Sequence, residues 1–165
     1  MTDLAPDLTA KAAALLDACR KRGWMLTTAE SCTGGLAMAG LTAIAGSSDV
    51  VERGFVTYAN AAKTDLLGVP PALIAEYGAV SAEVAKAMAE GALARSPAQV
   101  AVAITGIAGP GGGSSEKPVG LVHFACAATG RPTAQLRQVF AGNRDQVRHQ
   151  AVAAAFDLVL AATRS

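Results

Sequence analysis

The stretch W-M-L-T-T-A-E-S-C-T-G-G-L-A-M-A-G-L, residues 24–41, decides the fold. Residues 24–28 are apolar or β-branched, which is typical of a short strand. After Thr33, apolar residues recur at helical spacing until Gly46 ends the run. The polar, glycine-containing residues between the two patterns predict a tight turn. The stretch is therefore predicted to form a strand, a turn and a helix, which is the unit from which α/β proteins are built.

The rest of the chain continues this alternation. The apolar repeat from Leu4 predicts a helix with a basic last turn at Arg22 and an ending at Gly23. Further elements are predicted in this order: a strand at 54–59, a helix with Asn60 as its N-cap ending at Leu67, a helical turn from Pro71, a helix from Ser81 to Arg95, a strand at 99–104, a loop at 105–118, strands at 119–127 and 133–140, and a helix from Asn143 to 162. We expect a single three-layer α/β/α domain over 1–165, with a mixed sheet and a C-terminal hairpin plus helix.

Composition excludes several classes of protein. The 165 residues are 52% hydrophobic and 16% charged, which is the opposite of a disordered chain. No apolar run approaches the roughly 20 residues that cross a bilayer, so we expect no membrane partner. The net charge of +1 and the 4% aromatic content argue against nucleic acid as a partner. An acidic Asp3 stands where a signal peptide carries positive charge, so we expect a cytoplasmic protein.

The sequence offers no metal site. Cys19, Cys32 and Cys126 form no C-x-x-C pair, and His123 and His149 have no metal-ligand spacing. We therefore expect no metal and no cofactor. Cys32 keeps a second interpretation, because a thiol at a helix N-terminus has a lowered pKa and could act as a nucleophile with a histidine.

The turn after the first strand is the first candidate for chemistry. Ser31 could be exposed there as a nucleophile, and the amides that follow it could stabilise an oxyanion. The alternative is purely structural: Ser31 or Thr33 is the N-cap of the helix, and the glycines allow close packing.

Lys63 is the second candidate, because it lies in the first turn of a predicted helix and shortly after Tyr58. The helix dipole opposes a cation there by about 0.3–1 kcal/mol. This is less than the ~1.4 kcal/mol that corresponds to one pKa unit, so burial or a nearby arginine would have to lower the lysine pKa further before it could act as a base. The alternative is a solvated surface lysine.

Two further stretches could bind an anion. Thr105 and the glycines from Gly106 to Gly113 could wrap a phosphate or ribose, although they fit neither the Walker A nor the dinucleotide spacing. Arg144 and Arg148 lie one helical turn apart at a predicted helix N-terminus, in a final third with six basic and two acidic residues, a balance of +4. The alternatives are a flexible surface loop and pairing of the arginines with Asp145.

Six motifs in order resemble one family. They are A-E-S-C-T-G-G (29–35), G-F-V-T-Y-A-N-A-A-K (54–63), G-A-V-S (78–81), I-T-G-I-A-G-P-G-G-G (104–113), E-K-P-V-G (116–120) and the stretch 140–148. Together they resemble the CinA C-terminal domain family, the nicotinamide mononucleotide deamidases, from about Trp24 to Leu160. Ala59 stands where the family often has serine, and Leu121 where threonine is common. Neither departure removes a reactive group.

The resemblance implies hydrolysis of the carboxamide of nicotinamide mononucleotide to nicotinate mononucleotide and ammonia, in pyridine nucleotide salvage. It implies Ser31 as the nucleophile, Lys63 as its base, Tyr58 as an assisting residue, and a small-molecule nucleotide as the partner. We expect the substrate to be contacted by Cys32, Thr33, Gly34, Asn60, Thr105, Gly106, Gly109, Arg144 and Arg148. We also expect a homodimer or higher homo-oligomer. The alternative function is a catalytically silent nucleotide-binding module, since the family also contains this domain fused to another one.

Overall fold

Five strands form one mixed sheet in the order β2-β1-β3-β4-β5. The computed structural model describes residues 4–165, so Asp3 lies outside it. The strands are β1 (Leu26–Glu30), β2 (Val51–Val56), β3 (Val100–Gly106), β4 (Leu121–Ala128) and β5 (Ala134–Val139). β1 pairs in parallel with β2 and β3, whereas β4 runs antiparallel to both β3 and β5. The predicted mixed sheet with its C-terminal hairpin is confirmed.

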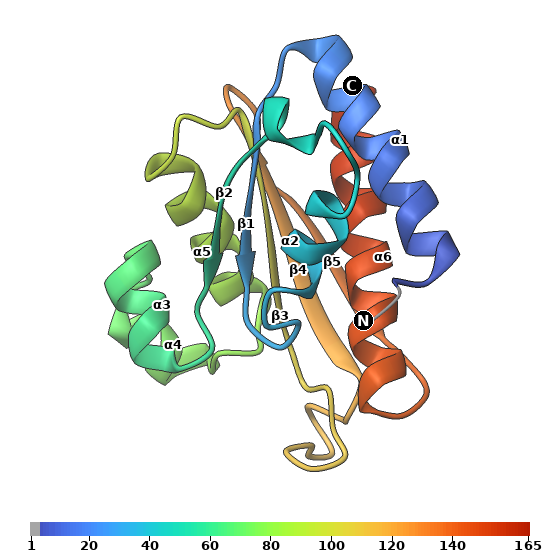
Figure 1. Ribbon diagram of the computed structural model, residues 1–165. Helices are drawn as coiled ribbons and strands as arrows, with labels where there is room; N and C mark the ends of the chain where they lie inside the picture. Colours follow the sequence, from blue (N-terminus) through green and yellow to red (C-terminus); the bar gives the residue numbers. More distant parts are fainter. Residues whose placement is uncertain (1–3) are drawn as a thin grey trace.

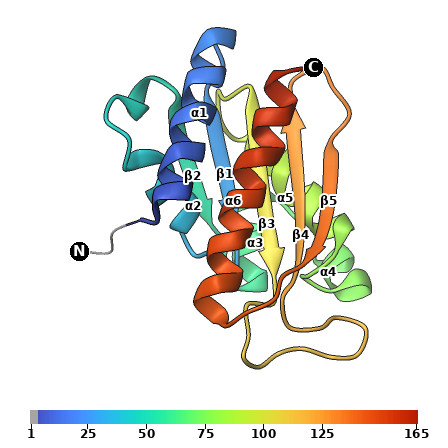
Figure 2. The ribbon, with the colours of Figure 1, turned by 90° about the vertical axis from the view of Figure 1, so that its right-hand side faces the viewer.

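Helices cover both faces of the sheet (Figures 1 and 2). On one face, α1 (Pro6–Arg22), α2 (Leu36–Thr42) and α6 (Arg144–Thr163) bury a large apolar core. On the other face lie α5 (Ala82–Ala94), α3 (Asn60–Leu67) and α4 (Pro71–Tyr77) over a smaller, alanine-rich core. A short 3-10 turn, η1 (Ser47–Asp49), leads into β2. The arrangement is the predicted three-layer α/β/α fold.

The predicted helix ends are largely confirmed. Gly23 follows α1 with φ of 66°, and Ser81 caps α5 by accepting a hydrogen bond from the Val84 N–H. Asn143 and Gln146 form a capping box at the start of α6. Asn60 is a correction: the N-cap of α3 is Ala59, and Asn60 is the first helical residue.

Two predicted strands are displaced by two or three residues. β1 begins at Leu26 rather than at position 24, and β2 ends at Val56 rather than at Ala59. The reason is the pairing register, since Val56 stands opposite Glu30, the last residue of β1. Beyond Glu30 the sheet offers β2 no partner, so the chain leaves it and enters α3.

The carboxyl ends of the parallel strands β1, β2 and β3 meet at one edge of the sheet, the lower end in Figure 1. At this edge the chain leaves β1 toward α2 on one face and leaves its neighbour β2 toward α3 on the other, so a crevice opens between these two strand ends, as is usual in open α/β sheets. Within residues 4–165, no helix is both long and apolar enough to cross a membrane.

Candidate active site

A cavity of about 280 Å³ lies at this edge of the sheet. Nine of the residues expected at the site line it: Ser31, Cys32, Tyr58, Asn60, Lys63, Thr105, Gly106, Gly109 and Arg144. Ala79, Val80 and further residues of the glycine-rich loop complete the wall. Thr33, Gly34 and Arg148 were also expected to contact the substrate, but they do not line the cavity. The fold therefore brings residues from five separate segments of the chain around one small space.

Lys63 is buried, with only 1% of its surface exposed. It is therefore not the solvated surface lysine of the alternative interpretation. Its Nζ lies 3.0 Å from Ser31 Oγ, 2.8 Å from the Thr57 carbonyl oxygen and 3.3 Å from the Tyr58 carbonyl oxygen. Its ammonium forms no salt bridge with any part of the chain between residues 4 and 165. Burial lowers the pKa of Lys63, because a desolvated site disfavours the charged form.

The three contacts of Lys63 Nζ suit both of its protonation states. A charged ammonium has three donors and can donate to all three oxygens. A neutral amine has two N–H groups and one lone pair. The two carbonyl oxygens can only accept, so they take the two N–H groups and leave the lone pair facing the Ser31 hydroxyl. A proton can therefore pass between Ser31 Oγ and Lys63 Nζ without movement of heavier atoms.

The turn that carries Ser31 is held by a buried carboxylate. Glu30 accepts hydrogen bonds from the Thr33 hydroxyl at 2.6 Å and from the backbone N–H groups of Ala37 and Met38 at 2.8 and 3.1 Å. It thereby satisfies the first turn of α2, whose N-cap, Gly35, has no side chain to do so. The interpretation of Ser31 or Thr33 as the N-cap is wrong, since neither caps the helix. Glu30 is not among the residues predicted for the site, although an acid shortly before a helix start is a recognisable signal.

Arg148 holds the same turn from the other side. Its guanidinium donates to the Cys32 carbonyl oxygen at 3.2 Å and to the Thr33 carbonyl oxygen at 2.9 Å. The backbone N–H groups of Cys32 and Thr33 donate to no other residue in the described chain. Of the two residues, Cys32 lines the cavity together with Ser31, so its N–H is an unused donor at the site.

Cys32 has the wrong environment for a nucleophilic thiolate. Burial raises its pKa to about 11, which keeps the thiol protonated near neutral pH. Within residues 4–165 it makes no hydrogen bond to a histidine: His123 lies on β4, and His149 contacts Asp7 near the start of α1. Burial is the largest influence on this pKa, and it exceeds the lowering contributions of the Cys32 backbone, Arg148 and Lys63.

Arg144 spans the mouth of the cavity. It donates to the Gly109 carbonyl oxygen at 2.7 Å and to the Tyr58 hydroxyl at 3.0 Å. Tyr58 is 61% exposed, so its hydroxyl meets Arg144 at the rim, while its carbonyl oxygen meets Lys63 inside. Neither Arg144 nor Arg148 forms a salt bridge with Asp145 in the described structure. Arg144 is thus the arginine that faces the cavity, and Arg148 supports the turn.

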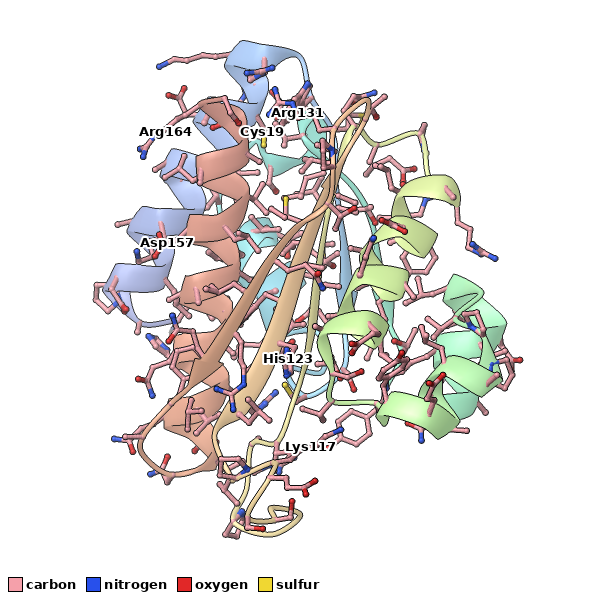
Figure 3. The ribbon with its side chains drawn as sticks, turned by 180° about the vertical axis from the view of Figure 1, so that it is seen from behind. Cys19, Lys117, His123, Arg131, Asp157 and Arg164 are labelled. Carbon is pink, nitrogen blue, oxygen red and sulfur yellow. The ribbon has the colours of Figure 1, made fainter. Side chains whose placement is uncertain are left out.

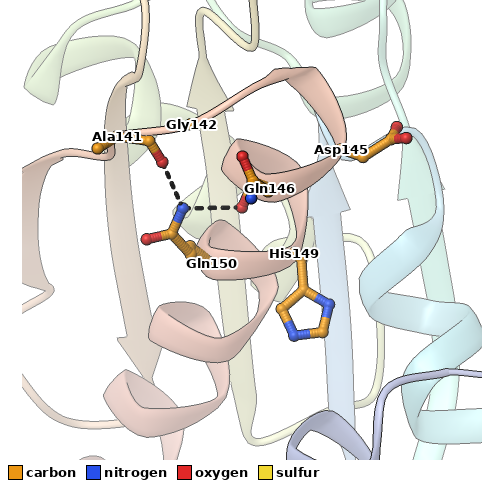
Figure 4. Close-up of a pocket in the computed structure, with 6 residues that line it drawn as sticks. All are labelled: Ala141, Gly142, Asp145, Gln146, His149 and Gln150. Atoms are coloured by element: carbon orange, nitrogen blue, oxygen red, sulfur yellow. Dashed lines mark hydrogen bonds between the residues drawn. The ribbon is translucent and has the colours of Figure 1, made fainter.

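A second hollow, of about 580 Å³ and more open, lies at the start of α6 (Figure 4). Gln150 crosses it by donating to the carbonyl oxygens of Ala141 and Gln146. Its two titratable side chains, Asp145 and His149, lie apart (Figure 4). The residues that line it include no serine, threonine or cysteine that a base could activate. The groups able to perform chemistry together are those of the smaller cavity. No group of three or more His, Cys, Asp or Glu side chains in residues 4–165 is arranged to hold a metal ion.

Residues 8–163 match the CinA C-terminal domain. The chain belongs to the CinA C-terminal domain family. Two relatives in this family are named nicotinamide-nucleotide amidohydrolase PncC. The protein from Escherichia coli strain K12 is 53% identical over 136 residues, which is 82% of each chain. The protein from Enterobacter agglomerans is 52% identical over 81% of this chain and 82% of the relative.

Other members of the family are longer. A CinA-like protein from Syntrophobacter fumaroxidans is 51% identical over 85% of this chain, which spans only 33% of that relative. Among solved structures, the competence/damage inducible protein CihA from Agrobacterium tumefaciens superimposes with a TM-score of 0.95 at 47% identity and covers all of both chains. A CinA superfamily protein from Escherichia coli gives a TM-score of 0.89 at 36% identity, covering 99% of this chain and 95% of that one. The family resemblance seen in the sequence is confirmed.

Proposed function

We propose that this chain is a nicotinamide-nucleotide amidase that converts nicotinamide mononucleotide to nicotinate mononucleotide and ammonia, with Ser31 as nucleophile and Lys63 as base. The observation that carries the proposal is the buried Lys63 amine 3.0 Å from the Ser31 hydroxyl. The names of the two PncC relatives supply the substrate class. The proposal retains a single domain, a cytoplasmic role in pyridine nucleotide salvage and a homo-oligomeric state.

The first half of the reaction forms an acyl-enzyme. Neutral Lys63 takes the proton of the Ser31 hydroxyl while Ser31 Oγ forms a bond to the carboxamide carbon. The carbonyl oxygen becomes an oxyanion, and the backbone N–H of Cys32, a residue that lines the cavity, is the donor that we assign to it. Lys63 then gives its proton to the departing nitrogen, the C–N bond breaks and ammonia leaves. The nicotinoyl group remains as an ester on Ser31.

The second half reverses these roles. Lys63, neutral again, takes a proton from water as the water oxygen attacks the ester carbon. The bond from carbon to Ser31 Oγ breaks, and the proton returns from Lys63 to that oxygen. Nicotinate mononucleotide is released. Each half thus requires one base that alternates between its two protonation states, which is what the three contacts of Lys63 Nζ allow.

The remaining residues of the cavity bind the nucleotide in this proposal. Arg144 is the one arginine among the cavity residues, and it can exchange the Tyr58 hydroxyl for a phosphate oxygen. The Thr105 hydroxyl donates to the Ala79 carbonyl oxygen and so fixes the part of the cavity wall that Ala79 forms. Asn60, Gly106 and Gly109 contribute the surface around the ribose. The Tyr58 side chain assists from the rim.

The test is release of ammonia and formation of the carboxylate product from a panel of pyridine nucleotides. We expect turnover of nicotinamide mononucleotide by the wild type, loss of activity in Ser31→Ala and Lys63→Ala, and retention of activity in Cys32→Ala as the matched neighbour. Calorimetric binding of the nucleotide with no turnover over hours would instead identify a silent binding module. A fully active Ser31→Ala variant would overturn the serine mechanism.

A further inference from the structure

The glycine-rich loop between β3 and β4 forms one wall of the cavity through Ile107, Ala108, Gly109, Gly111 and Gly112. Between positions 108 and 117, two hydrogen bonds connect this loop to other parts of the described chain. One is the bond from Arg144 to Gly109. The other runs from the Lys117 Nζ to the Tyr77 carbonyl oxygen, at 2.6 Å. A loop with so few attachments depends strongly on each of them.

Lys117 reaches its acceptor at the C-terminal end of α4. The carbonyl groups there lack helical partners and carry the negative end of the helix dipole, so an ammonium is favoured. Gly78 lies against the ammonium: a Cβ at this position would stand 2.7 Å from Lys117 Nζ, so a larger residue would require the lysine side chain to shift. Within the loop, the Lys117 N–H donates to Ser114 Oγ, and its carbonyl accepts from the Ser114 N–H. Lys117 lies at the loop end of the molecule (Figure 3).

Tyr77, whose carbonyl oxygen accepts the hydrogen bond from Lys117, leads directly into another part of the cavity wall. Ala79 and Val80 line that wall. The Thr105 hydroxyl donates to the Ala79 carbonyl oxygen at 2.8 Å, and the Ser81 hydroxyl donates to the Gly78 carbonyl oxygen at 2.8 Å. The 78–81 segment is thus fixed by β3 and by the start of α5, and Lys117 connects the glycine-rich loop to the end of α4 immediately before it.

We infer that Lys117 is a positioning residue for the amidase reaction: it ties the glycine-rich loop to the end of α4 and thereby sets the width of the nucleotide cavity. The inference rests on the proposed function. Lys117 is not among the cavity residues and lies outside the Ser31–Lys63 pair, so its loss leaves the reacting groups in place. It acts on binding of the nucleotide rather than on the chemical step.

The experiment compares Lys117→Met with Lys117→Arg, which keeps a cationic donor, and with Lys86→Met, a substitution at an exposed lysine of α5. In Lys117→Met we expect KM for nicotinamide mononucleotide to rise about three- to tenfold, the change expected from loss of one hydrogen bond, with kcat within twofold of wild type. Lys117→Arg should restore KM, and Lys86→Met should leave it unchanged.

Hydrogen exchange on the free proteins separates this inference from the proposed function, because it needs no turnover. We expect faster exchange of the two hydrogen-bonded amides of the loop, at positions 114 and 117, in Lys117→Met, while exchange in β3 and α5 stays as in the wild type. Faster exchange confined to α4 would mean that Lys117 only caps that helix, and this would overturn the inference. Unchanged exchange in the loop, an unchanged KM, or a fall in kcat alone would overturn it as well. If the wild type has no activity, the proposed function is wrong. Hydrogen exchange then still tests whether Lys117 holds the glycine-rich loop.

Discussion

Replacing Lys63 by methionine removes the proposed base and keeps a side chain of similar length. Within residues 4–165, Lys63 is the side chain that forms a hydrogen bond with Ser31 Oγ, so the variant leaves this hydroxyl without a described partner that can take its proton. General base catalysis contributes roughly 10²–10⁴-fold, so kcat should fall by about that factor. The double variant Ser31→Ala/Lys63→Met should be about as slow as either single variant, since residues that act as one unit are not additive.

The effect of the same substitution on folding has two opposing parts. The carbonyl oxygens of Thr57 and Tyr58 lose their donor; the Thr57 oxygen is buried, so leaving it unpaired costs about 1–3 kcal/mol, and the partly buried Tyr58 oxygen adds less. Removal of the amine in turn removes a group whose charged form is penalised by several kcal/mol when buried. The two parts have similar size, so the melting temperature should change by only a few degrees while activity is lost.

The assay is steady-state ammonia release, with circular dichroism and calorimetric binding of the product nucleotide as controls for folding and for an intact cavity. Lys86→Met serves as the matched lysine substitution at an exposed position. A Lys63→Met variant that folds, binds the nucleotide and keeps more than a tenth of wild-type kcat would refute the assignment of Lys63 as the base.

Four further predictions follow from the site. Because burial lowers the pKa of Lys63 and the neutral amine is the active form, kcat should rise with pH through the pKa of Lys63 in the folded enzyme. Between that pKa and 10.5 the unfolded chain binds one more proton than the folded chain, so the contribution of Lys63 to the free energy of unfolding should also rise with pH. The Tm of the wild type compared with that of Lys63→Met across this pH range checks the sign. Cys32→Ala should stay active and iodoacetamide should inactivate the wild type only slowly near neutral pH, as expected for a thiol of pKa about 11; rapid inactivation would contradict this. Arg144→Met should raise KM with little change in Tm, because this arginine lies at the cavity. Arg148→Met should lower the free energy of unfolding by about 1–3 kcal/mol in urea and also lower kcat, because this arginine holds the turn that carries Ser31. The reverse pattern would exchange the two roles. Glu30→Gln should destabilise the fold by about 1–3 kcal/mol in the same measurement, because an amide NH₂ would face a helix N–H or the Thr33 hydroxyl; a neutral result would mean that this carboxylate does not hold the turn.

The order of elements could be predicted from the sequence because local rules fix it. Ser81 and the Asn143–Gln146 pair carry their capping chemistry in their own side chains, and Gly23 is suited to a left-handed backbone wherever the helix ends. The ends of β1 and β2 could not be predicted in this way. A strand stops where its neighbour stops, and the register between them is a property of the sheet.

The candidate site also contains features that the sequence predicts and features that it does not. Ser31 at a strand-to-helix turn and the glycines after Thr105 are visible as motifs, because such turns have their own residue signature. The division of labour between Arg144 and Arg148 is not, since both occupy equivalent positions one helical turn apart. Packing of α6 against the turn after β1 directs one guanidinium to the Cys32 and Thr33 carbonyl oxygens and leaves the other at the cavity.

The sequence by itself determined the α/β class, the family and the presence of a hydroxyl and a lysine in separate motifs, because periodicity, capping and motif order are local properties of the chain. Only the tertiary structure decided that the two meet. Lys63 and Ser31 are 32 positions apart, and their contact depends on β1 and β2 ending side by side. The burial that lowers the pKa of Lys63 exists only once the ends of β1 and β2 and helix α3 are packed together, since desolvation is a property of the whole surrounding structure.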